Sequence, residues 1–196
     1  REIAAGSITL NGTTITSPTP QQVRQLGLAY VPEERMRDGA IGEFTVAENL
    51  MLVDYVAPPF TQRGLLNATA IEQRSGELID GYGVKTPTMH TPTRHLSGGN
   101  IQKVVIARVF SSSSDALVVA QPTRGVDIGA AEYIHERLLE QRSSGSAILL
   151  ISEDLDEIMQ LSDRIIVVLE GEIMGEVSRA DATVKDIGLL MAGVTE

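Results

Sequence analysis

Strand-length runs of apolar residues alternate with helical segments in the second half of the chain, and this alternation constrains the fold most strongly. The strand-like runs are Ala116–Ala120, Ala147–Ile151 and Arg164–Leu169. The helices expected around them are Ala130–Gln141, Asp154–Leu161 and Ala182–Met191. Continuous apolar strands joined through helices are typical of a parallel sheet covered on both faces. The sequence therefore predicts an α/β fold with a parallel-sheet core.

The first 45 residues are expected to be rich in β-structure. Asn11-Gly12 stands between Ser7–Leu10 and Thr13–Thr16 and predicts a two-residue hairpin, because these residue types adopt the positive φ angles of a type I′ turn. Leu28–Val31 is a further expected strand. Glu33–Glu43 follows it as a charged segment that we expect to be a loop.

The middle of the chain is expected to be helical. Thr45 can cap a helix over Val46–Val53, and Asn67 can cap a longer helix over residues 68–82. Lys85–His95 is rich in Thr and Pro and predicts a loop.

Composition excludes several classes of protein. With 16 Lys and Arg against 26 Asp and Glu, the net charge is 16 − 26 = −10, which argues against holding nucleic acid through counterion release. No cysteine is present, so disulfides and thiolate metal sites are excluded, and we expect no metal ligands of the chain's own. No apolar run approaches the roughly 18–20 residues of a membrane-spanning helix. The chain begins at Arg1 without a signal peptide or an initiator Met, which is compatible with a cytosolic protein and an upstream segment.

An α/β domain of this kind often binds a nucleotide, but the usual phosphate-binding loop is missing. That loop needs a Gly directly before its Lys. The three lysines, Lys85, Lys103 and Lys185, follow Val84, Gln102 and Val184 instead.

The most informative segment is Leu96-Ser97-Gly98-Gly99-Asn100, which precedes a helix expected over Ile101–Phe110. A Ser and two Gly at a helix start can present N–H groups and a hydroxyl to an anion at the positive end of the helix dipole. The same residues also fit a simple helix start, in which Ser97 caps the helix and the glycines permit a tight entry.

The neighbouring residues favour the first interpretation. Leu96–Arg108 resembles the signature motif of ABC ATPases, and Leu117–Asp127 resembles the Walker B strand and the D-loop of that family. Tyr30–Glu33 resembles its Q-loop, and Ile151–Glu157 resembles the strand end that carries its switch histidine. In detail, the residues of these motifs are similar to those of the second, C-terminal cassette of fused ATPases that drive simple-sugar and nucleoside importers. Among these importers, the residues favour the nucleoside branch.

The resemblance implies an architecture and partners. The fold would be an ABC ATPase cassette that starts after its phosphate loop, with a β-rich core part at 1–45, a helical subdomain at 46–96 and the rest of the core at 97–196. It implies ATP and Mg²⁺ in the assembled transporter, at the cytoplasmic face of the plasma membrane. The expected partners are a second cassette (fused upstream or as a second copy), permease subunits and, indirectly, a solute-binding protein, but no nucleic acid.

Several positions depart from the family pattern. Ala120 stands where the family has the Asp of the metal shell, and Gln121 stands where it has the catalytic Glu. Glu153 takes the place of the switch His, and Glu33 that of the Q-loop Gln. Losing a positioned base costs a factor of about 10²–10⁴, so a site built on this Walker B strand should be nearly inactive.

Because cassettes of this family face each other head to tail, the resemblance still leaves a role. Ser97, Gly98, Gly99 and Asn100 would contact the ATP of the partner cassette, with Asp127 in the D-loop beside them. Two alternatives stay open at this point. One is a soluble ABC protein of translation or DNA repair, against which the acidic charge counts. The other is a non-catalytic, regulatory interaction module that retains the fold.

Overall fold

The computed structural model describes residues 5–112 and 114–194. These fall into two compact units, Arg1–Leu149 and Leu150–Glu196, and each is described by itself. The strands are β1 (Ile8–Leu10), β2 (Thr13–Ile15), β3 (Leu28–Val31), β4 (Thr61–Gln62), β5 (Leu65–Leu66), β6 (Ala116–Ala120), β7 (Ala147–Ile151), β8 (Arg164–Leu169) and β9 (Glu172–Ser178). The helices are α1 (Pro20–Gln25), α2 (Val46–Met51), α3 (Ala68–Gly81), α4 (Gly98–Phe110), α5 (Ile128–Ser143), α6 (Leu155–Leu161) and α7 (Val184–Met191), with short turns η1 (Arg35–Gly39) and η2 (Thr93–His95).

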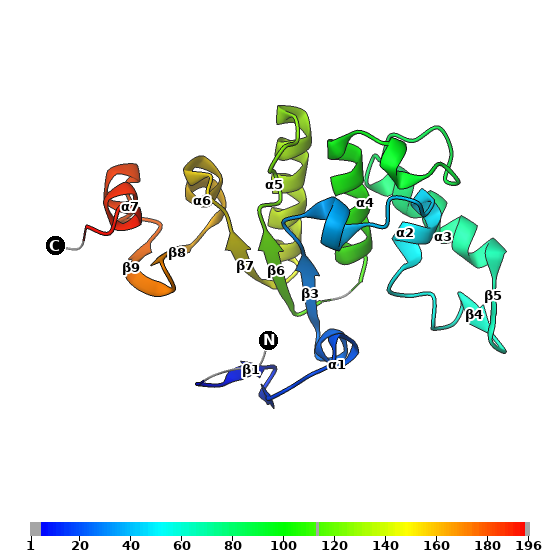
Figure 1. Cartoon of the computed structure of the whole chain (residues 1–196), viewed down its shortest axis with the longest axis horizontal. Helices are drawn as coiled ribbons and strands as arrows, with labels where there is room; N and C mark the ends of the chain where they lie inside the picture. The colour runs from blue at the N-terminus through cyan, green and yellow to red at the C-terminus, as the bar shows by residue number, and fades with distance from the viewer. Residues whose placement is uncertain (1–4, 113, 195–196) are drawn as a thin grey trace. The chain divides into compact units, whose positions relative to one another are not determined.

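The core of the first unit is a sheet with the strand order β3-β6-β7. β3 and β6 pair in parallel, from Leu28 opposite Ala116 to Val31 opposite Val119. Figure 1 shows that α4 and α5 both start at the edge where β3 and β6 end. The predicted α/β class with a parallel-sheet core is confirmed, and this edge is where such sheets usually bind ligands.

The expected cover on both faces is wrong for β7. Its residues alternate between exposed and half-buried, and Leu149 and Ile151 are 58% and 49% exposed. A run of apolar residues identifies the strand, but it does not say what packs against each face.

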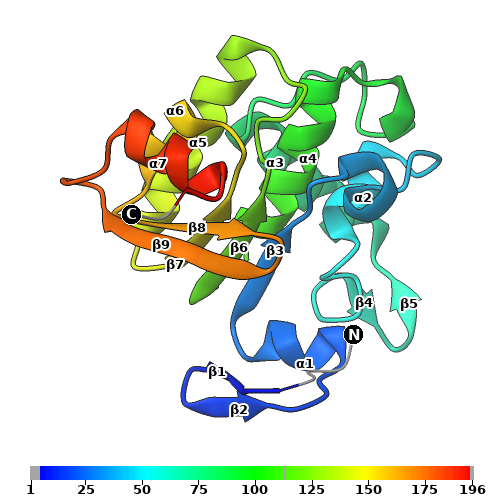
Figure 2. The same ribbon diagram turned by 60° about the vertical axis from the view of Figure 1, so that its left-hand side comes forward.

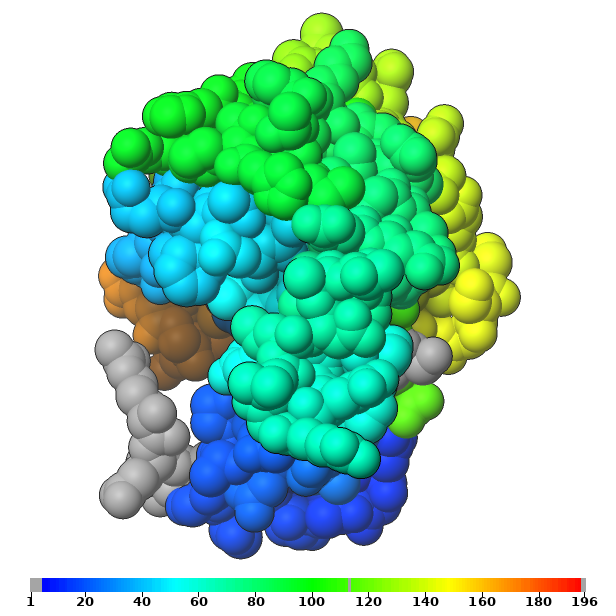
Figure 3. Space-filling model, turned by 90° about the vertical axis from the view of Figure 1, so that its right-hand side faces the viewer, coloured from blue at the N-terminus to red at the C-terminus, as the bar shows by residue number. Residues whose placement is uncertain are grey.

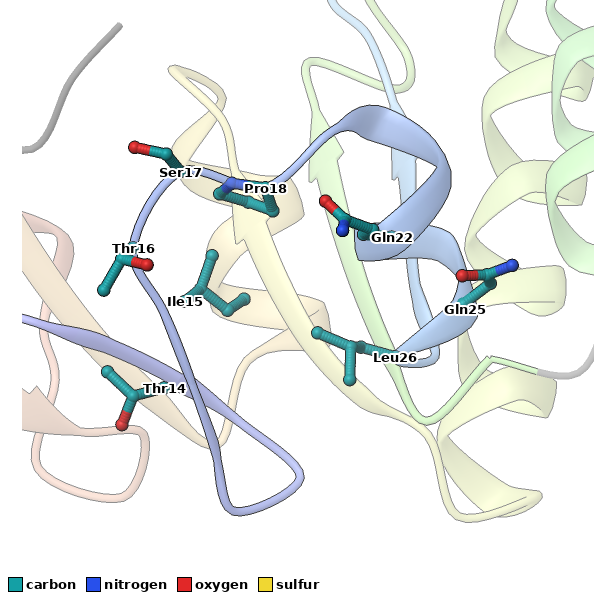
Figure 4. Close-up of a pocket in the computed structure, with 8 residues that line it drawn as sticks. All are labelled: Thr14, Ile15, Thr16, Ser17, Pro18, Gln22, Gln25 and Leu26. Atoms are coloured by element: carbon teal, nitrogen blue, oxygen red, sulfur yellow. The ribbon is translucent and has the colours of Figure 1, made fainter.

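The β-rich start of the chain follows the sequence closely. Asn11 and Gly12 have φ angles of 48° and 75°, as the type I′ turn between β1 and β2 requires. An open pocket of about 360 Å³ lies between β2 and α1, and Figure 4 shows Ile15 and Leu26 pointing toward each other across it.

The middle region is helical, as predicted, and packs onto α4. Val46 and Leu50 of α2 share a buried cluster with Leu78 of α3 and Val104 of α4. Thr45 caps α2 in a reciprocal arrangement with Glu48, which explains why the helix begins where expected. Figure 3 looks onto the surface of this region, in cyan to green.

Two further elements of the first unit differ from prediction. The charged segment Glu33–Glu43 contains η1, a π-helical turn closed by the Ala40 N–H donating to the Arg35 carbonyl, so the expected loop is partly wrong. The hairpin of β4 and β5 has no sequence signal of the usual kind. Its turn residues Arg63 and Gly64 have φ angles of 52° and 79°, a conformation that Arg seldom adopts.

One cation is held inside the first unit. Arg108 of α4 is buried, and its guanidinium donates to the carbonyls of Asn49 (3.0 Å) and Gly39 (2.5 Å). Burial lowers the pKa of Arg108 to about 10. The side chain thus ties α4 to both α2 and the end of η1.

The second unit is built on an antiparallel pair. β8 and β9 pair from Arg164 opposite Ser178 to Leu169 opposite Glu172, with an irregularity after Val167. A small core of Ile165, Val167, Ala182 and Ile187 lies between this pair and the helices. Figure 2 shows the two strands side by side with α7 against them.

The predicted division at 45/46 and 96/97 remains a prediction. The compact units divide instead after Leu149, inside β7. Residues 1–4, 113, 195 and 196 of the predicted parts lie outside the described residues. Across the described residues, none of the helices combines the length and apolar character that crossing a membrane requires.

Candidate functional site

The candidate site begins at the start of α4. The helix starts at Gly98, three residues before the predicted Ile101, so both glycines belong to its first turn. Ser97 precedes them with an extended backbone (φ −67°, ψ 156°) and is exposed, while Gly99 is buried. The N–H groups of a first helical turn have no partner within the helix, and they carry the positive end of its dipole.

The expected cap by the Ser97 side chain is wrong. Within the described chain, this side chain makes no capping hydrogen bond to α4. Its Oγ instead accepts a hydrogen bond from Asn100 Nδ2 at 2.9 Å, and Asn100 Oδ1 accepts one from the Lys85 N–H at 2.7 Å. Since Oγ is the acceptor toward Asn100, the hydroxyl hydrogen of Ser97 is left to donate elsewhere.

Close packing explains both glycines. A Cβ atom at Gly98 would lie 2.6 Å from Arg35 Nη2, and one at Gly99 would lie 3.2 Å from the Ala130 Cβ and 3.4 Å from Asp127 Oδ2. Asp127 caps α5, because its Oδ1 accepts from the Ala130 N–H at 2.9 Å. The starts of α4 and α5 are therefore packed against each other, with Gly99 at the contact.

Residues 33–35 and 124–125 cross-link the ends of β3 and β6. Glu33 forms an ion pair with Arg124. In the opposite direction, Arg35 donates through Nη1 to the Arg124 carbonyl (2.6 Å) and through Nη2 to the Gly125 carbonyl (3.1 Å). The structure thus brings together three of the predicted groups: Glu33, the Ser97–Asn100 segment and Asp127.

The end of β6 has a different character. Ala120 is buried and carries no atom that could bind Mg²⁺ or its water shell. Gln121 follows with φ 46° and offers an uncharged amide. Across the described residues, no cluster of three or more His, Asp or Glu is arranged to hold a metal ion. These residues do not fit the Mg²⁺ site that the resemblance implies, and we assign no metal-dependent step to them.

Glu153 lies in the second unit, which is described by itself. It is exposed in the turn between β7 and α6, where the Asp154 N–H donates to Ser152 Oγ at 3.0 Å. Asp154 caps α6 by accepting from the N–H groups of Asp156 and Glu157.

Sequence reasoning missed Arg35 and Arg124 as members of the site. Arg35 lies two residues after the segment Tyr30–Glu33, and Arg124 lies inside Leu117–Asp127. The signal available was the residue type, because the planar guanidinium of Arg presents its donors in a fixed fork that can hold two acceptors at once.

Known proteins are similar to this chain in sequence and in fold. Residues 1–124 match the family described as ABC transporter. The guanosine import ATP-binding protein NupO of Bacillus subtilis is 42% identical over 196 residues, which is all of this chain and 38% of NupO. The nucleoside import ATP-binding protein NupA of Lactococcus lactis is 43% identical over 98% of this chain and 38% of its own length. The chain therefore spans less than two fifths of these relatives.

Among solved structures, a dimeric ATP-binding cassette in a post-hydrolysis state, bound to ADP and Pi, has a TM-score of 0.74 at 20% identity. The match covers 91% of this chain and 75% of the cassette. At this identity the likeness establishes the fold, an ABC cassette.

Proposed function

The chain belongs to the ABC transporter family, and from that premise we propose that it is an ATP-binding part of an importer for a nucleoside or a simple sugar. It supplies the signature segment, Leu96–Asn100, to the ATP site of a partner cassette, while its own site is degenerate. The names of NupO and NupA support a nucleoside as the transported solute. The second, C-terminal cassette of a fused ATPase is the place we propose for it.

The single observation that carries this proposal is the state of the α4 start. Ser97 is exposed, with Oγ held by Asn100 and its hydroxyl hydrogen left to donate. The first-turn N–H groups at Gly98 and Gly99 point out of the same helix end. Preorganised donors of this kind stabilise the charge that develops on a transferred phosphoryl group. Bound ATP would supply the γ-phosphate, and this chain would orient it.

The chain's own site lacks the groups for chemistry. Ala120 cannot replace a metal-binding Asp, and Gln121 is a poor base. Glu153 would add negative charge where the family has a His. Hydrolysis is therefore proposed for the partner's site, with Mg²⁺ held by the partner.

An exposed apolar residue supports a cassette partner. Ile128, the first residue of α5, is 80% exposed and follows Asp127, which borders Gly99. In the proposed pair, the Ile128 side chain would lie at the contact with the partner cassette, next to the signature segment. The remaining proposed partners are permease subunits and, through them, a solute-binding protein, at the cytoplasmic face of the membrane.

Nucleotide binding and turnover, measured with and without the partner cassette, test the proposal. We expect no measurable ATP hydrolysis by the chain alone and turnover when the partner is present. Hydrolysis by the chain alone, unchanged in a Gln121 variant, would reveal a contaminant, whereas hydrolysis that Gln121 variants alter would contradict the proposal. A partner complex that neither binds nor hydrolyses ATP would favour the regulatory module.

A further inference from the structure

We propose that Arg35 is a positioning residue, which holds the loop at residues 122–127 against the start of α4. This inference rests on the proposed function, because it assigns the way in which the signature segment and the loop are presented together to a partner. We call Arg35 and its contacts with Arg124, Gly125 and Gly98 the Arg35 clamp.

The first argument is the double hydrogen bond. Arg35 Nη1 donates to the Arg124 carbonyl at 2.6 Å and Nη2 to the Gly125 carbonyl at 3.1 Å. The planar guanidinium fixes both acceptors at once, whereas the compact ammonium of Lys cannot reproduce that fork. Two consecutive carbonyls are thus held in one orientation by a side chain that lies about 90 residues earlier in the sequence.

The second argument is that two glycines border the guanidinium. A Cβ at Gly98 would lie 2.6 Å from Arg35 Nη2, and a Cβ at Gly125 would lie 3.4 Å from the same atom. The Cβ at Gly98 would also lie 3.4 Å from the Gly125 carbonyl oxygen. Arg35 therefore occupies a slot between two glycines, one in the signature segment and one in the loop.

The third argument is that the turn η1, which carries Arg35, is itself attached to α4. Arg35 is the first residue of η1, and Gly39 at the other end of η1 accepts a hydrogen bond from the buried Arg108 of α4 at 2.5 Å. η1 is thereby attached to α4 near the end of that helix, while Arg35 reaches Gly98 at its start. The ion pair between Glu33 and Arg124 links the same two segments in the opposite direction.

It follows that Gly98 is required for a reason internal to the chain. A side chain at position 98 must displace the end of Arg35, and the displaced guanidinium then loses the carbonyls of Arg124 and Gly125. A change at position 98 and a change at position 35 should therefore release the same loop.

Arg35→Ala and Arg35→Lys in the intact transporter test the clamp, with Arg37→Ala as the matched control. Arg37 lies in the same turn η1 and loses the same charge, but it is exposed and pairs with its neighbour Asp38. Steady-state ATP turnover and hydrogen exchange of the backbone amides at 124–127 are measured together. We expect Arg35→Ala to lower kcat about tenfold and to speed exchange at 124–127, with the KM for ATP and exchange within α4 nearly unchanged. Arg35→Lys should resemble Arg35→Ala, and Arg37→Ala should stay near the wild type.

A double variant separates the clamp from general damage to the fold. If Gly98→Ala acts by expelling Arg35, Arg35→Ala combined with Gly98→Ala should be no slower than the slower single variant. The inference would be overturned if the losses in turnover of the two single variants multiplied in the double variant. It would also be overturned if Arg35→Ala showed the same exchange and turnover as Arg37→Ala. If the wild-type complex hydrolyses no ATP, the proposed function fails, and exchange at 124–127 alone still decides whether the clamp exists.

Discussion

The start of α4 and the end of β6 lie at the same edge of the sheet, yet they differ in the chemical groups that they carry. At the start of α4, Ser97 is exposed and two glycines form the first helical turn. At the end of β6, a buried Ala120 is followed by the amide of Gln121. A helix end can bind a phosphate that another chain carries, whereas a strand end without a carboxylate supplies neither the ligand that Mg²⁺ prefers nor a base for a water.

The two regions also differ in how firmly the fold constrains them. Ala120 is an apolar side chain at a buried strand end, so the fold accepts it readily. Gly98 and Gly99 are bordered by Arg35 and Ala130, so a larger residue at either position must displace its neighbour. A change at the end of β6 can therefore leave the surrounding packing intact, whereas a change at either signature glycine disturbs it.

Replacement of Gly99 by Asp should have the largest effect. The new Cβ would lie 3.2 Å from the Ala130 Cβ and 3.4 Å from Asp127 Oδ2, so a second carboxylate would stand at the helix end that we propose to bind phosphate. We expect ATP turnover of the intact transporter to fall at least about a hundredfold. If a variant that still folds had the turnover of the wild type, Ser97-Gly98-Gly99 would have no role beyond starting the helix.

Ser97→Ala should have the next largest effect and sharpens the comparison, because it removes a donor without disturbing the helix. Ser97 makes no capping bond to α4 in the described chain, so the melting temperature should barely change. We expect turnover to fall about tenfold or more. Ser111→Ala, at the other end of α4, is the control, since its Oγ bonds the Arg108 carbonyl away from the site. Equal turnover in the two variants would contradict a phosphate role for Ser97.

Ile128→Ser should weaken association with the partner cassette. This side chain is 80% exposed, and burying an isoleucine contributes about 1.5–3 kcal/mol, of which a peripheral contact realises part. We expect ATP-dependent association, followed by light scattering or analytical centrifugation, to weaken about fivefold. Ile173→Ser, 69% exposed on β9, serves as a control that should leave association unchanged. Equal weakening by both would show that Ile128 has no special place in the contact.

Gln121→Glu should have the smallest effect. Restoring one group does little when Ala120 and Glu153 are unchanged, because residues that act as a unit are strongly non-additive. We expect turnover within about twofold of the wild type in membranes with the solute-binding protein present. Replacement of the corresponding Glu of the partner cassette should stop turnover. A rise of about tenfold in Gln121→Glu would show that this site is already assembled for chemistry.

Local features were predictable from the sequence because they depend on near neighbours. The Asn11-Gly12 turn and the Thr45 cap of α2 follow from residues within three positions of each other. The parallel strands also follow, since their apolar runs are continuous.

Features that depend on distant partners were not predictable. Arg35 finds its acceptors about 90 positions away, and Asn100, which donates to Ser97 Oγ, accepts at its other end from the Lys85 N–H, 15 positions away. The exposure of Leu149 likewise depends on what packs against β7 and not on the strand itself. The sequence thus predicted Glu33, the Ser97–Asn100 segment and Asp127 for the candidate site, but not Arg35, Arg124 or the contacts that these residues make.

The most direct test of the central claim is the number of ATP molecules that one assembled pair of cassettes hydrolyses in a single turnover. The assembled transporter is loaded with labelled ATP, freed of excess nucleotide, and the ADP formed is counted per pair. The account predicts at most one ADP per pair, formed at the partner's site, and none when Gly99→Asp is present in this chain. Two ADP per pair would show that the site with Ala120 and Gln121 is catalytic, and would contradict the division of roles between the two regions.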